Sequence, residues 1–481
     1  MPVISRRDLL SSGLSLSASS LLARSAWART ASLLADMPQG SAEAVPALAP
    51  REHLLFDFDW KFTFGNGVDP TKDLGFGFGQ GDFAKTGDFK FAKAKFDDSM
   101  WRTLNLPHDW AVDLPFVNDD EQNSHGFKPL GRRYPESSVG WYRREFDIPA
   151  SDLGRRITIE FDGAFRDVFV FVNGCFIGRN NNGYAPFRFD LTDYLAYGAK
   201  NYIVLRVDAS FGDGWFYEGA GVYRHVWLTK TDAVHLGKWE SWVRPAVTGN
   251  AATLSLGTIV QNQGKQAATA KVSWKILDSK GTTVATAEAA GQKIDVDGTA
   301  SYTASAKLAN PTLWSVNEPN LYSAIVTVES EGKVRDAERV SFGVRTAEFT
   351  ADKGFFLNGK PLKIQGTCNH QDHAGVGAAV PDRLQWFRLA VLREMGGNAV
   401  RTSHNMPTPE WVEACDRMGM MMMCETRQMN ATPEGLEQLA TMVKRYRNSP
   451  SIILWSIGNE EWVLQGEMAE QGAKIASTMV R

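Results

Sequence analysis

The sequence predicts a multidomain protein of the β plus α/β class: a jelly-roll β-sandwich, an immunoglobulin-like β-sandwich and the first half of a TIM (β/α)8 barrel. Up to residue 345, short strand patterns follow one another without an amphipathic helix between them, which is typical of sandwiches. From residue 346 onward, continuously apolar strands alternate with helices, as in a parallel sheet covered by helices. A chain of 481 residues has room for about three domains.

Residues 1–28 are predicted to be an export signal of the twin-arginine type. Paired arginines in SRRDLL (5–10) precede a stretch rich in Leu, Ser and Ala, and AWA (26–28) is a small-x-small cleavage site. The apolar stretch is too short to be a permanent membrane anchor. We therefore expect a periplasmic or secreted bacterial protein without a membrane anchor, with residues 29–48 as a linker.

Composition excludes some partners. The formal net charge is only −3, and no long run of one sign occurs, so no nucleic-acid partner is expected. The oligomeric state is left open. Four cysteines show neither metal-ligand spacing nor a regular framework, and we expect them to be buried free thiols. They are Cys175, Cys368, Cys415 and Cys424.

Residues 49–232 are expected to form the jelly roll. The segment RRITIEFDGAFRDVFVFVNGCFIGRN (155–180) alternates apolar and polar residues over two runs. Asn173 and Gly174 separate these runs, and Asn-Gly is a strong hairpin signal because both turn positions need positive φ. Residues 233–345 carry roughly seven further strand patterns, which fits an immunoglobulin-like sandwich. No titratable cluster marks its faces, so a spacer role is expected.

Residues 346–481 are expected to supply the half-barrel. Its strands are predicted at PLKIQG (361–366), NAVRTS (398–403), MMMMC (420–424) and IILWSI (452–457). Thr408 and Thr432 are each followed by proline, which is a typical helix start. A doubly wound sheet would show the same order of elements, but PLKIQGTCNH lacks the spacing of a dinucleotide-binding loop. The barrel is therefore favoured.

The first helix of this region is predicted over residues 382–395, where a pair of glycines ends it. Its apolar face is expected to consist of Leu384, Phe387, Val391, Leu392 and Met395.

Polar side chains follow all four predicted strands, and in a parallel barrel the strand ends form the working face. The residues are Asn369, His370, Asp372 and His373; Arg401, His404 and Asn405; Glu425 and Arg427; and Asn459, Glu460 and Glu461. A metal site is not expected, because no His-Glu-x-x-His helix or cysteine partner accompanies these histidines. No G-x-S-x-G elbow supports a serine nucleophile. Carboxylate chemistry fits best, with His and Arg holding a polyhydroxylated ligand.

Two stretches resemble the signature sequences of family 2 glycoside hydrolases, which include β-galactosidases, β-glucuronidases and β-mannosidases. They are NAVRTSHNMPTPEWVEACDRMG (398–419) and RNSPSIILWSIGNEE (447–461). LNLPHDW, GWYRREF, DGAFRDVFVFVNG and EGAGVYRHVWL extend the match upstream. The resemblance covers nearly all of the chain after the signal and implies the same order of three domains, with no organic cofactor.

The resemblance also implies residue roles. Glu460 corresponds to the general acid/base, which protonates the leaving oxygen and later activates water. Asn459 would bond the 2-hydroxyl of the sugar. The residues implied in binding the terminal sugar are His370, Arg401, His404 and Asp208. Some β-galactosidases bind magnesium through a Glu-x-His after strand three, but CETRQM has no histidine there, so no metal is expected.

The expected substrate is a terminal β-galactoside in a glycoside or oligosaccharide. Glucuronide or mannoside specificity within the family, and a non-catalytic carbohydrate-binding role of the jelly roll, are the alternatives. The resemblance places the nucleophilic glutamate after barrel strand seven, whereas this sequence ends just beyond strand four. A retaining mechanism needs both carboxylates about 5–5.5 Å apart. We therefore expect the chain by itself to lack the nucleophile and to be inactive.

Overall fold

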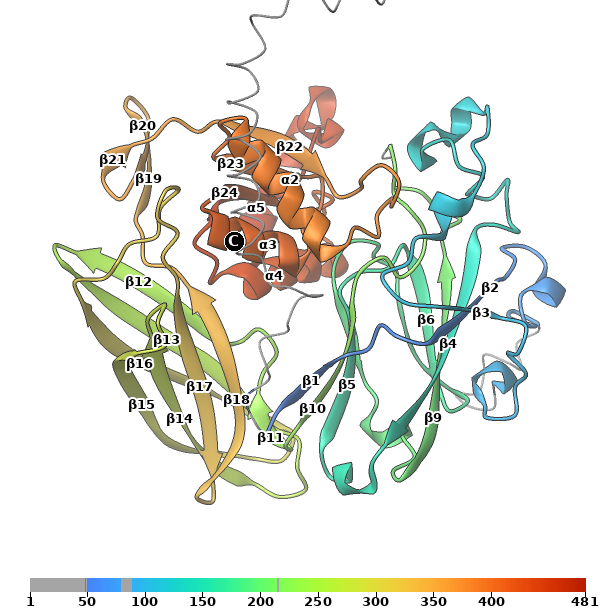
Figure 1. The fold of residues 1–481 in the computed structure, drawn as a ribbon, viewed down its shortest axis with the longest axis horizontal. Coiled ribbons are helices and arrows are strands. Elements are labelled where there is room, and N and C mark those ends of the chain that lie inside the picture. The colour runs from blue at the N-terminus through green and yellow to red at the C-terminus, as the bar shows by residue number, and fades with distance from the viewer. Residues whose placement is uncertain (1–47, 49, 79–88, 214–215) are drawn as a thin grey trace, which may run out of the picture.

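The computed structural model describes residues 48, 50–78, 89–213 and 216–481. Two β-sandwiches are joined by contacts such as Arg51 to Asp336, and a half-barrel of parallel strands lies against both (Figure 1). The predicted fold class is confirmed. The predicted export signal (1–28) and nearly all of the predicted linker (29–48) lie outside the described residues. Within the described ranges, no helix has both the length and the apolar character needed to cross a membrane.

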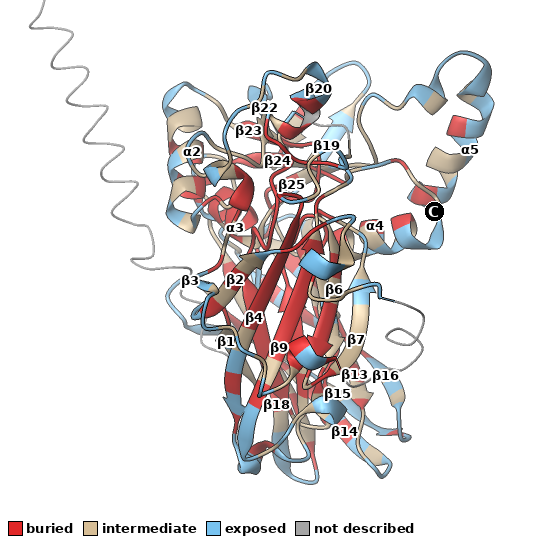
Figure 2. Ribbon diagram, turned by 90° about the vertical axis from the view of Figure 1, so that its right-hand side faces the viewer, coloured by how far each residue is buried: buried red, intermediate tan, exposed pale blue. Residues whose placement is uncertain are grey.

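The jelly roll consists of two antiparallel sheets. The first has the order β1 (Glu52–Leu55), β10 (Val226–Thr231), β5 (Arg156–Phe161) and β8 (Phe187–Asp190). The second has the order β3 (Arg102–Leu104), β2 (Trp60–Phe64), β4 (Val139–Ile148), β9 (Ala199–Asp208), β6 (Asp167–Val172) and β7 (Cys175–Asn180). Apolar side chains of both sheets form one core, and the long strands β4 and β9 are mostly buried (Figure 2).

The hairpin between β6 and β7 forms as predicted. Asn173 and Gly174 make its turn with φ values of 52° and 89°. The side-chain oxygen of Asn173 accepts a hydrogen bond from the backbone N–H of Tyr202 at 2.9 Å, and its amide donates to Asn201 at 2.7 Å. The turn is therefore held by β9 as well as by its own backbone preference.

The immunoglobulin-like sandwich also has two antiparallel sheets. One contains β11 (Val234–Leu236), β13 (Ala251–Asn262) and β12 (Trp242–Thr248), with β16 (Gly298–Ala309) paired to β13. The other has the order β15 (Thr283–Ile294), β14 (Ala268–Leu277), β17 (Tyr322–Ser330) and β18 (Lys333–Phe342). The fully buried Trp274 lies in the core between them. Apolar packing holds this sandwich together without a disulfide in the described residues.

The half-barrel begins with a small antiparallel sheet of β19 (Ala347–Thr350), β20 (Gly354–Leu357) and β21 (Lys360–Pro361). Its parallel sheet has the order β22 (Gly366–His370), β23 (Ala399–Ser403), β24 (Met421–Glu425) and β25 (Ile452–Ser456). The helices are α2 (Asp382–Glu394), α3 (Pro409–Met418), α4 (Pro433–Tyr446) and, after β25, α5 (Ala469–Val480). The predicted caps are confirmed: Thr408 accepts from Trp411 N–H, and Thr432 from Gly435 N–H.

The predicted position of the first barrel strand is wrong. The strand β22 starts at Gly366, so PLKIQG lies almost entirely before it. The apolar Leu362 packs instead with Phe355 and Leu357 of the small sheet. The pairing partner of β23 is the more polar segment GTCNH, because strand pairing here is decided by the chain path and not by apolar character.

The predicted apolar face of α2 is wrong in part, although Leu392 does pack against the half-barrel core. The buried residues of this helix are Gln385, Trp386, Leu389 and Ala390. Phe387 is 42% exposed and Met395 75% exposed. Apolar residues occur around most of the circumference of α2, so the hydrophobic period does not single out one face. The buried face is set by Trp386 and Leu389, which pack into a cluster with residues of α3 and β23.

The four cysteines are all free, but not all are buried. Cys415 and Cys424 are buried as expected, whereas Cys175 is half-buried and Cys368 is exposed. Cys368 pairs in register with Arg401 on β22 and β23, so both side chains lie on the same face of the sheet. The expectation of a buried thiol is therefore wrong for Cys368.

Candidate active site

The carboxyl ends of β22 to β25 meet at one edge of the parallel sheet. His370 lies opposite Ser403, and Glu425 lies opposite Ser456. Two groups of the predicted polar residues are brought together here. A pocket between the half-barrel and the jelly roll is lined by His370, Asp372, His404, Asn405 and Arg427, and hydrogen bonds join Arg401 to Glu425 and Asn459. This edge is where a barrel presents catalytic side chains.

Glu425 is the buried centre of this edge. Its carboxylate accepts hydrogen bonds from Arg401 Nε at 2.7 Å, His404 Nδ1 at 2.6 Å and Ser456 Oγ at 2.7 Å. The side chain has no exposed surface, so the arginine and these donors offset the cost of burying its charge. In the structure Glu425 orients Arg401 and His404.

Arg401 links Glu425 to Asn459, which follows β25. Its Nη2 donates to Asn459 Oδ1 at 2.8 Å, while its Nε binds Glu425. Holding the carbonyl oxygen of the Asn459 amide directs its NH2 group the other way, where it can donate to a ligand. The predicted ligand-binding residues Arg401 and Asn459 are thus in direct contact.

His370 lies close to His404. Their ring centroids are 5.5 Å apart with the planes at 81°. Burial lowers the pKa of His370, and the nearby Asp372 opposes that shift. The ring of His370 is therefore neutral at neutral pH, when it can both donate and accept hydrogen bonds.

The two glutamates after β25 have different environments. Glu460 is exposed, has a φ of 51° and accepts no hydrogen bond from any described residue. Glu461 is half-buried, and its Oε1 accepts backbone N–H groups of Met429 at 2.9 Å and Asn459 at 3.3 Å. Glu461 therefore fixes the turn that presents Glu460, and Glu460 keeps its carboxylate available for a ligand.

The pocket beside this edge has walls from two domains. The jelly roll contributes Tyr184 and Tyr217. The half-barrel contributes His370, Gln371, Asp372, Ser403, His404, Asn405 and Arg427. Aromatic rings opposite polar groups are suited to a sugar, whose C–H faces stack and whose hydroxyls form hydrogen bonds.

The buried carboxylate of Asp109 joins these two walls. It accepts hydrogen bonds from Tyr217 Oη at 2.8 Å and from the backbone N–H groups of Ala378 and Ala220, both at 2.9 Å. Ala378 belongs to the loop between β22 and α2, whereas Ala220 follows Tyr217 in the jelly roll. Asp109 thus sets the position of Tyr217 relative to the half-barrel.

Asp208 is placed apart from the pocket lining. It ends β9, where its carboxylate accepts from Arg206 Nη1 at 3.0 Å and from Ser210 N–H at 2.9 Å. The loop that follows does reach the half-barrel, because Arg427 donates to the carbonyl of Asp213 at 2.6 Å. The predicted sugar contact of Asp208 stays a prediction.

Within the described ranges, the ends of β22 to β25 hold no cluster of three metal-ligating side chains. The one such cluster among the described residues consists of His225, Asp382 and Glu410. It joins the jelly roll to the first residues of two barrel helices.

Family models match most of the chain after the signal. The sugar-binding domain of glycosyl hydrolases family 2 matches residues 127–232, the second domain of that family matches residues 235–345, and its TIM barrel domain matches residues 349–433 and 427–479. The chain belongs to glycosyl hydrolases family 2. Its three folded regions therefore correspond in order to the domains of this family.

Individual relatives of this family 2 chain differ in name. A β-galactosidase of Bacteroides ovatus, BoGH2A, is 34% identical over 88% of this chain and 48% of its own length. A β-glucuronidase of Formosa agariphila is 28% identical over 77% and 41%. The crystal structure of a family 2 member from Bacteroides cellulosilyticus has a TM-score of 0.78 at 30% identity, over 89% and 54%. The chain thus spans about half the length of the curated relatives it matches.

Some pocket residues were not identified as functional from the sequence. Tyr184, Tyr217 and Gln371 carry no recognisable spacing, and only the tertiary fold brings them to the strand ends. Asp109 had a signal: it lies in LNLPHDW, one of the stretches that resemble the family. Its link to the pocket through Tyr217 requires the structure.

Proposed function

We propose that this chain holds the acid/base half of a retaining β-galactosidase-type active site that acts on terminal β-galactosides. The observation that carries the proposal is the connected set from Glu425 through Arg401 to Asn459, next to the exposed Glu460. It matches what the mechanism needs: an ordered ligand-binding edge and a carboxylic acid open to the ligand. The β-galactosidase relative from Bacteroides ovatus supports the galactoside.

In the proposed reaction, Glu460 donates its proton to the glycosidic oxygen as the bond to the sugar breaks. The glycosyl group is held by a second carboxylate until a water molecule, deprotonated by Glu460, attacks. Asn459 bonds the 2-hydroxyl through its NH2 group. His370, Arg401 and His404 hold the terminal sugar while Tyr217 forms the opposite wall of the pocket.

The second carboxylate of this mechanism is not supplied by the other glutamates at the strand ends. Glu425 is bound by Arg401, His404 and Ser456, and Glu461 by two backbone amides. An attacking carboxylate must instead face the anomeric carbon directly. We therefore propose that these 481 residues need a further segment with that carboxylate in order to hydrolyse a glycoside.

A glucuronide is the second candidate substrate. One relative is named β-glucuronidase, and the pocket includes Arg427. A guanidinium group there is suited to the carboxylate of a glucuronide. A galactoside has a neutral hydroxymethyl group at the same position and gains nothing comparable.

The proposal is tested with two proteins. The first is this chain alone, assayed with p-nitrophenyl β-galactoside and β-glucuronide, for which no hydrolysis is expected. The second is a chimera in which residues 48–481 replace the matching half of the Bacteroides ovatus relative, for which galactosidase activity is expected. Hydrolysis by the chain alone, lost in Glu460→Gln, would show that it holds a complete site.

The role of Glu460 is tested in the chimera. Glu460→Ala should lower kcat/KM by about 10²–10⁴-fold for a poor leaving group and much less for dinitrophenolate, which needs no protonation. Azide should restore turnover of the variant and yield the β-galactosyl azide. Unchanged kcat/KM in Glu460→Ala would refute the assignment. Galactoside binding by residues 48–345 alone would instead favour a carbohydrate-binding role of the sandwiches.

A further inference from the structure

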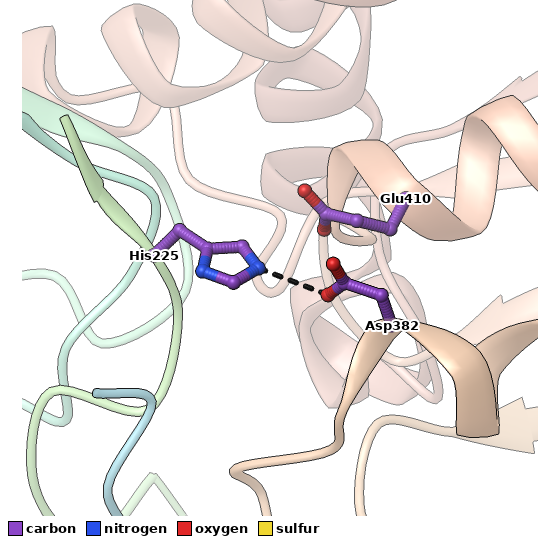
Figure 3. A group of neighbouring side chains, drawn as sticks. All are labelled: His225, Asp382 and Glu410. Atoms are coloured by element: carbon purple, nitrogen blue, oxygen red, sulfur yellow. Dashed lines mark hydrogen bonds and ion pairs between the residues drawn. The ribbon is translucent and has the colours of Figure 1, made fainter. Parts of the chain in front are cut away.

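A buried cluster of ionisable groups lies where the jelly roll meets the half-barrel. His225 comes just before β10, Asp382 is the first residue of α2, and Glu410 lies in the first turn of α3 (Figure 3). One ligand atom from each residue lies within 4.8 Å of the other two. The proposed glycosidase chemistry uses none of these groups.

The imidazole of His225 is already oriented as a metal ligand would be. Its Nδ1 is 2.5 Å from Asp57 Oδ2, and Asp57 is itself fixed by the backbone N–H of Val226 at 2.8 Å. An Nδ1–H that donates to a carboxylate leaves the lone pair on Nε2, and metal-binding histidines are usually held in this way. Nε2 points to Asp382 Oδ1, at 2.9 Å.

The carboxylate of Glu410 points into the cluster without a partner outside it. The residue is 8% exposed. Among the described residues, its hydrogen bonding is limited to its own backbone N–H. A buried carboxylate with so few donors is costly unless it is protonated or binds a cation. The charged groups that most affect its pKa are His225, which lowers it, and Asp162 and Asp382, which raise it.

We propose that His225 Nε2, Asp382 and Glu410 form a binding site for a transition-metal dication of the zinc type, which holds the jelly roll to α2 and α3. One imidazole nitrogen with two carboxylates is a donor set that zinc accepts, with water in the remaining position. Bond lengths of about 2.0–2.2 Å place tetrahedral ligands about 3.4 Å apart. To reach that spacing, His225 Nε2 and Asp382 Oδ1, which are 2.9 Å apart, must separate by about 0.5 Å, and any longer distance in the cluster, at most 4.8 Å, must shorten.

A metal ion at this site competes with protons for its ligand atoms. In the metal-free protein, burial lowers the pKa of His225, but its hydrogen bonds to Asp382 and Asp57 raise it well above the ordinary value. Burial raises the pKa of Glu410 to about 7. Metal binding at His225 Nε2 and at the Glu410 carboxylate requires both groups to be deprotonated. The Nδ1–H to Asp57 remains in place.

The site is tested by binding Zn²⁺ to the EDTA-treated chain in a Cys368→Ser background, which removes the exposed thiol as a competing ligand. Isothermal titration at pH 7.5 should show one site, and Zn²⁺ should raise the Tm by several degrees. Glu410→Gln and Asp382→Asn should each weaken binding at least tenfold, and Asp57→Asn by about 10–100-fold. Circular dichroism confirms that each variant is folded.

Glu413→Gln is the matched control, because Glu413 lies on the same helix and pairs with Arg417 on the surface. It should leave Zn²⁺ binding unchanged. Three results would each overturn the proposal. The first is equal Zn²⁺ affinity in wild type and Glu410→Gln, and the second is no binding by the folded wild type at 1 mM Zn²⁺, a concentration on the order of the weakest specific affinities. The third is tighter binding of Ca²⁺ than of Zn²⁺. These readouts do not depend on the proposed glycosidase activity.

Discussion

Arg401 and Glu425 form an ion pair in which the carboxylate is completely buried and the arginine also reaches Asn459. The pair connects the ends of β23, β24 and β25. It therefore determines where the amide next to the proposed acid Glu460 points. Because the two residues come from different strands, this relationship depends on the parallel pairing of the sheet.

Replacing Glu425 with glutamine should disorder this edge. The neutral amide leaves Arg401 and His404 without a charged acceptor, so we expect the free energy of unfolding to fall by about 2 kcal/mol. Urea denaturation of the chain measures this. Conservative replacement of the exposed Glu434, as Glu434→Gln, serves as the control. A loss below about 0.5 kcal/mol would contradict the anchoring role of Glu425.

The neighbours Glu460 and Glu461 should respond in opposite ways. Glu461→Ala removes the acceptor of two backbone N–H groups and should cost about 1–2 kcal/mol of stability, while Glu461→Gln keeps an acceptor oxygen and should cost much less. Glu460→Gln should change stability by less than about 0.5 kcal/mol but abolish most activity of the chimera. Denaturation and kinetics on the same preparations separate the two effects. A large stability loss in Glu460→Gln would give it a structural role instead.

Asp109→Asn should affect both domains. The carboxylate accepts four hydrogen bonds, including one from Ala111 N–H at 3.0 Å, and the asparagine NH2 group would face donors. We expect a loss of about 3 kcal/mol in stability. In the chimera, KM should also rise, because Tyr217 loses its acceptor. Tyr217→Phe is the matching variant and should reproduce the rise in KM with a smaller loss of stability.

The pH dependence of stability should reveal the proton on Glu410. Burial raises its pKa from 4.5 to about 7 in the folded protein, so the folded state holds a proton that the unfolded chain loses near pH 4.5. This stabilisation is complete below pH 4.5 and is lost as the pH rises through 7. Relative to Glu410→Gln, the wild type should lose about 2–3 kcal/mol between pH 4.5 and 7.5.

This measurement is made in EDTA, so that metal binding does not interfere. Glu413→Gln should show the same pH profile as the wild type, because Glu413 is exposed on the surface of α3. A constant difference between wild type and Glu410→Gln across this range would mean that Glu410 is ionised throughout.

The sequence alone determined the architecture and most of the polar residues at the ends of the barrel strands. Local patterns such as Asn173-Gly174, Thr408-Pro409 and the apolar run of β25 specify turns, helix starts and strands, because these depend on neighbouring residues only. The positions of His370, Arg401, His404 and Asn459 followed from the rule that parallel strand ends share one edge.

The tertiary structure decided what each side chain does at that edge. Contacts between residues far apart in the chain decide whether Glu425 attacks a ligand or anchors Arg401. Such contacts also decide which face of α2 is buried and bring His225 to Asp382 and Glu410. Such contacts are set by how the sheets and helices pack together. No local pattern of residues encodes the distance between two charged groups, and that distance fixes their chemistry.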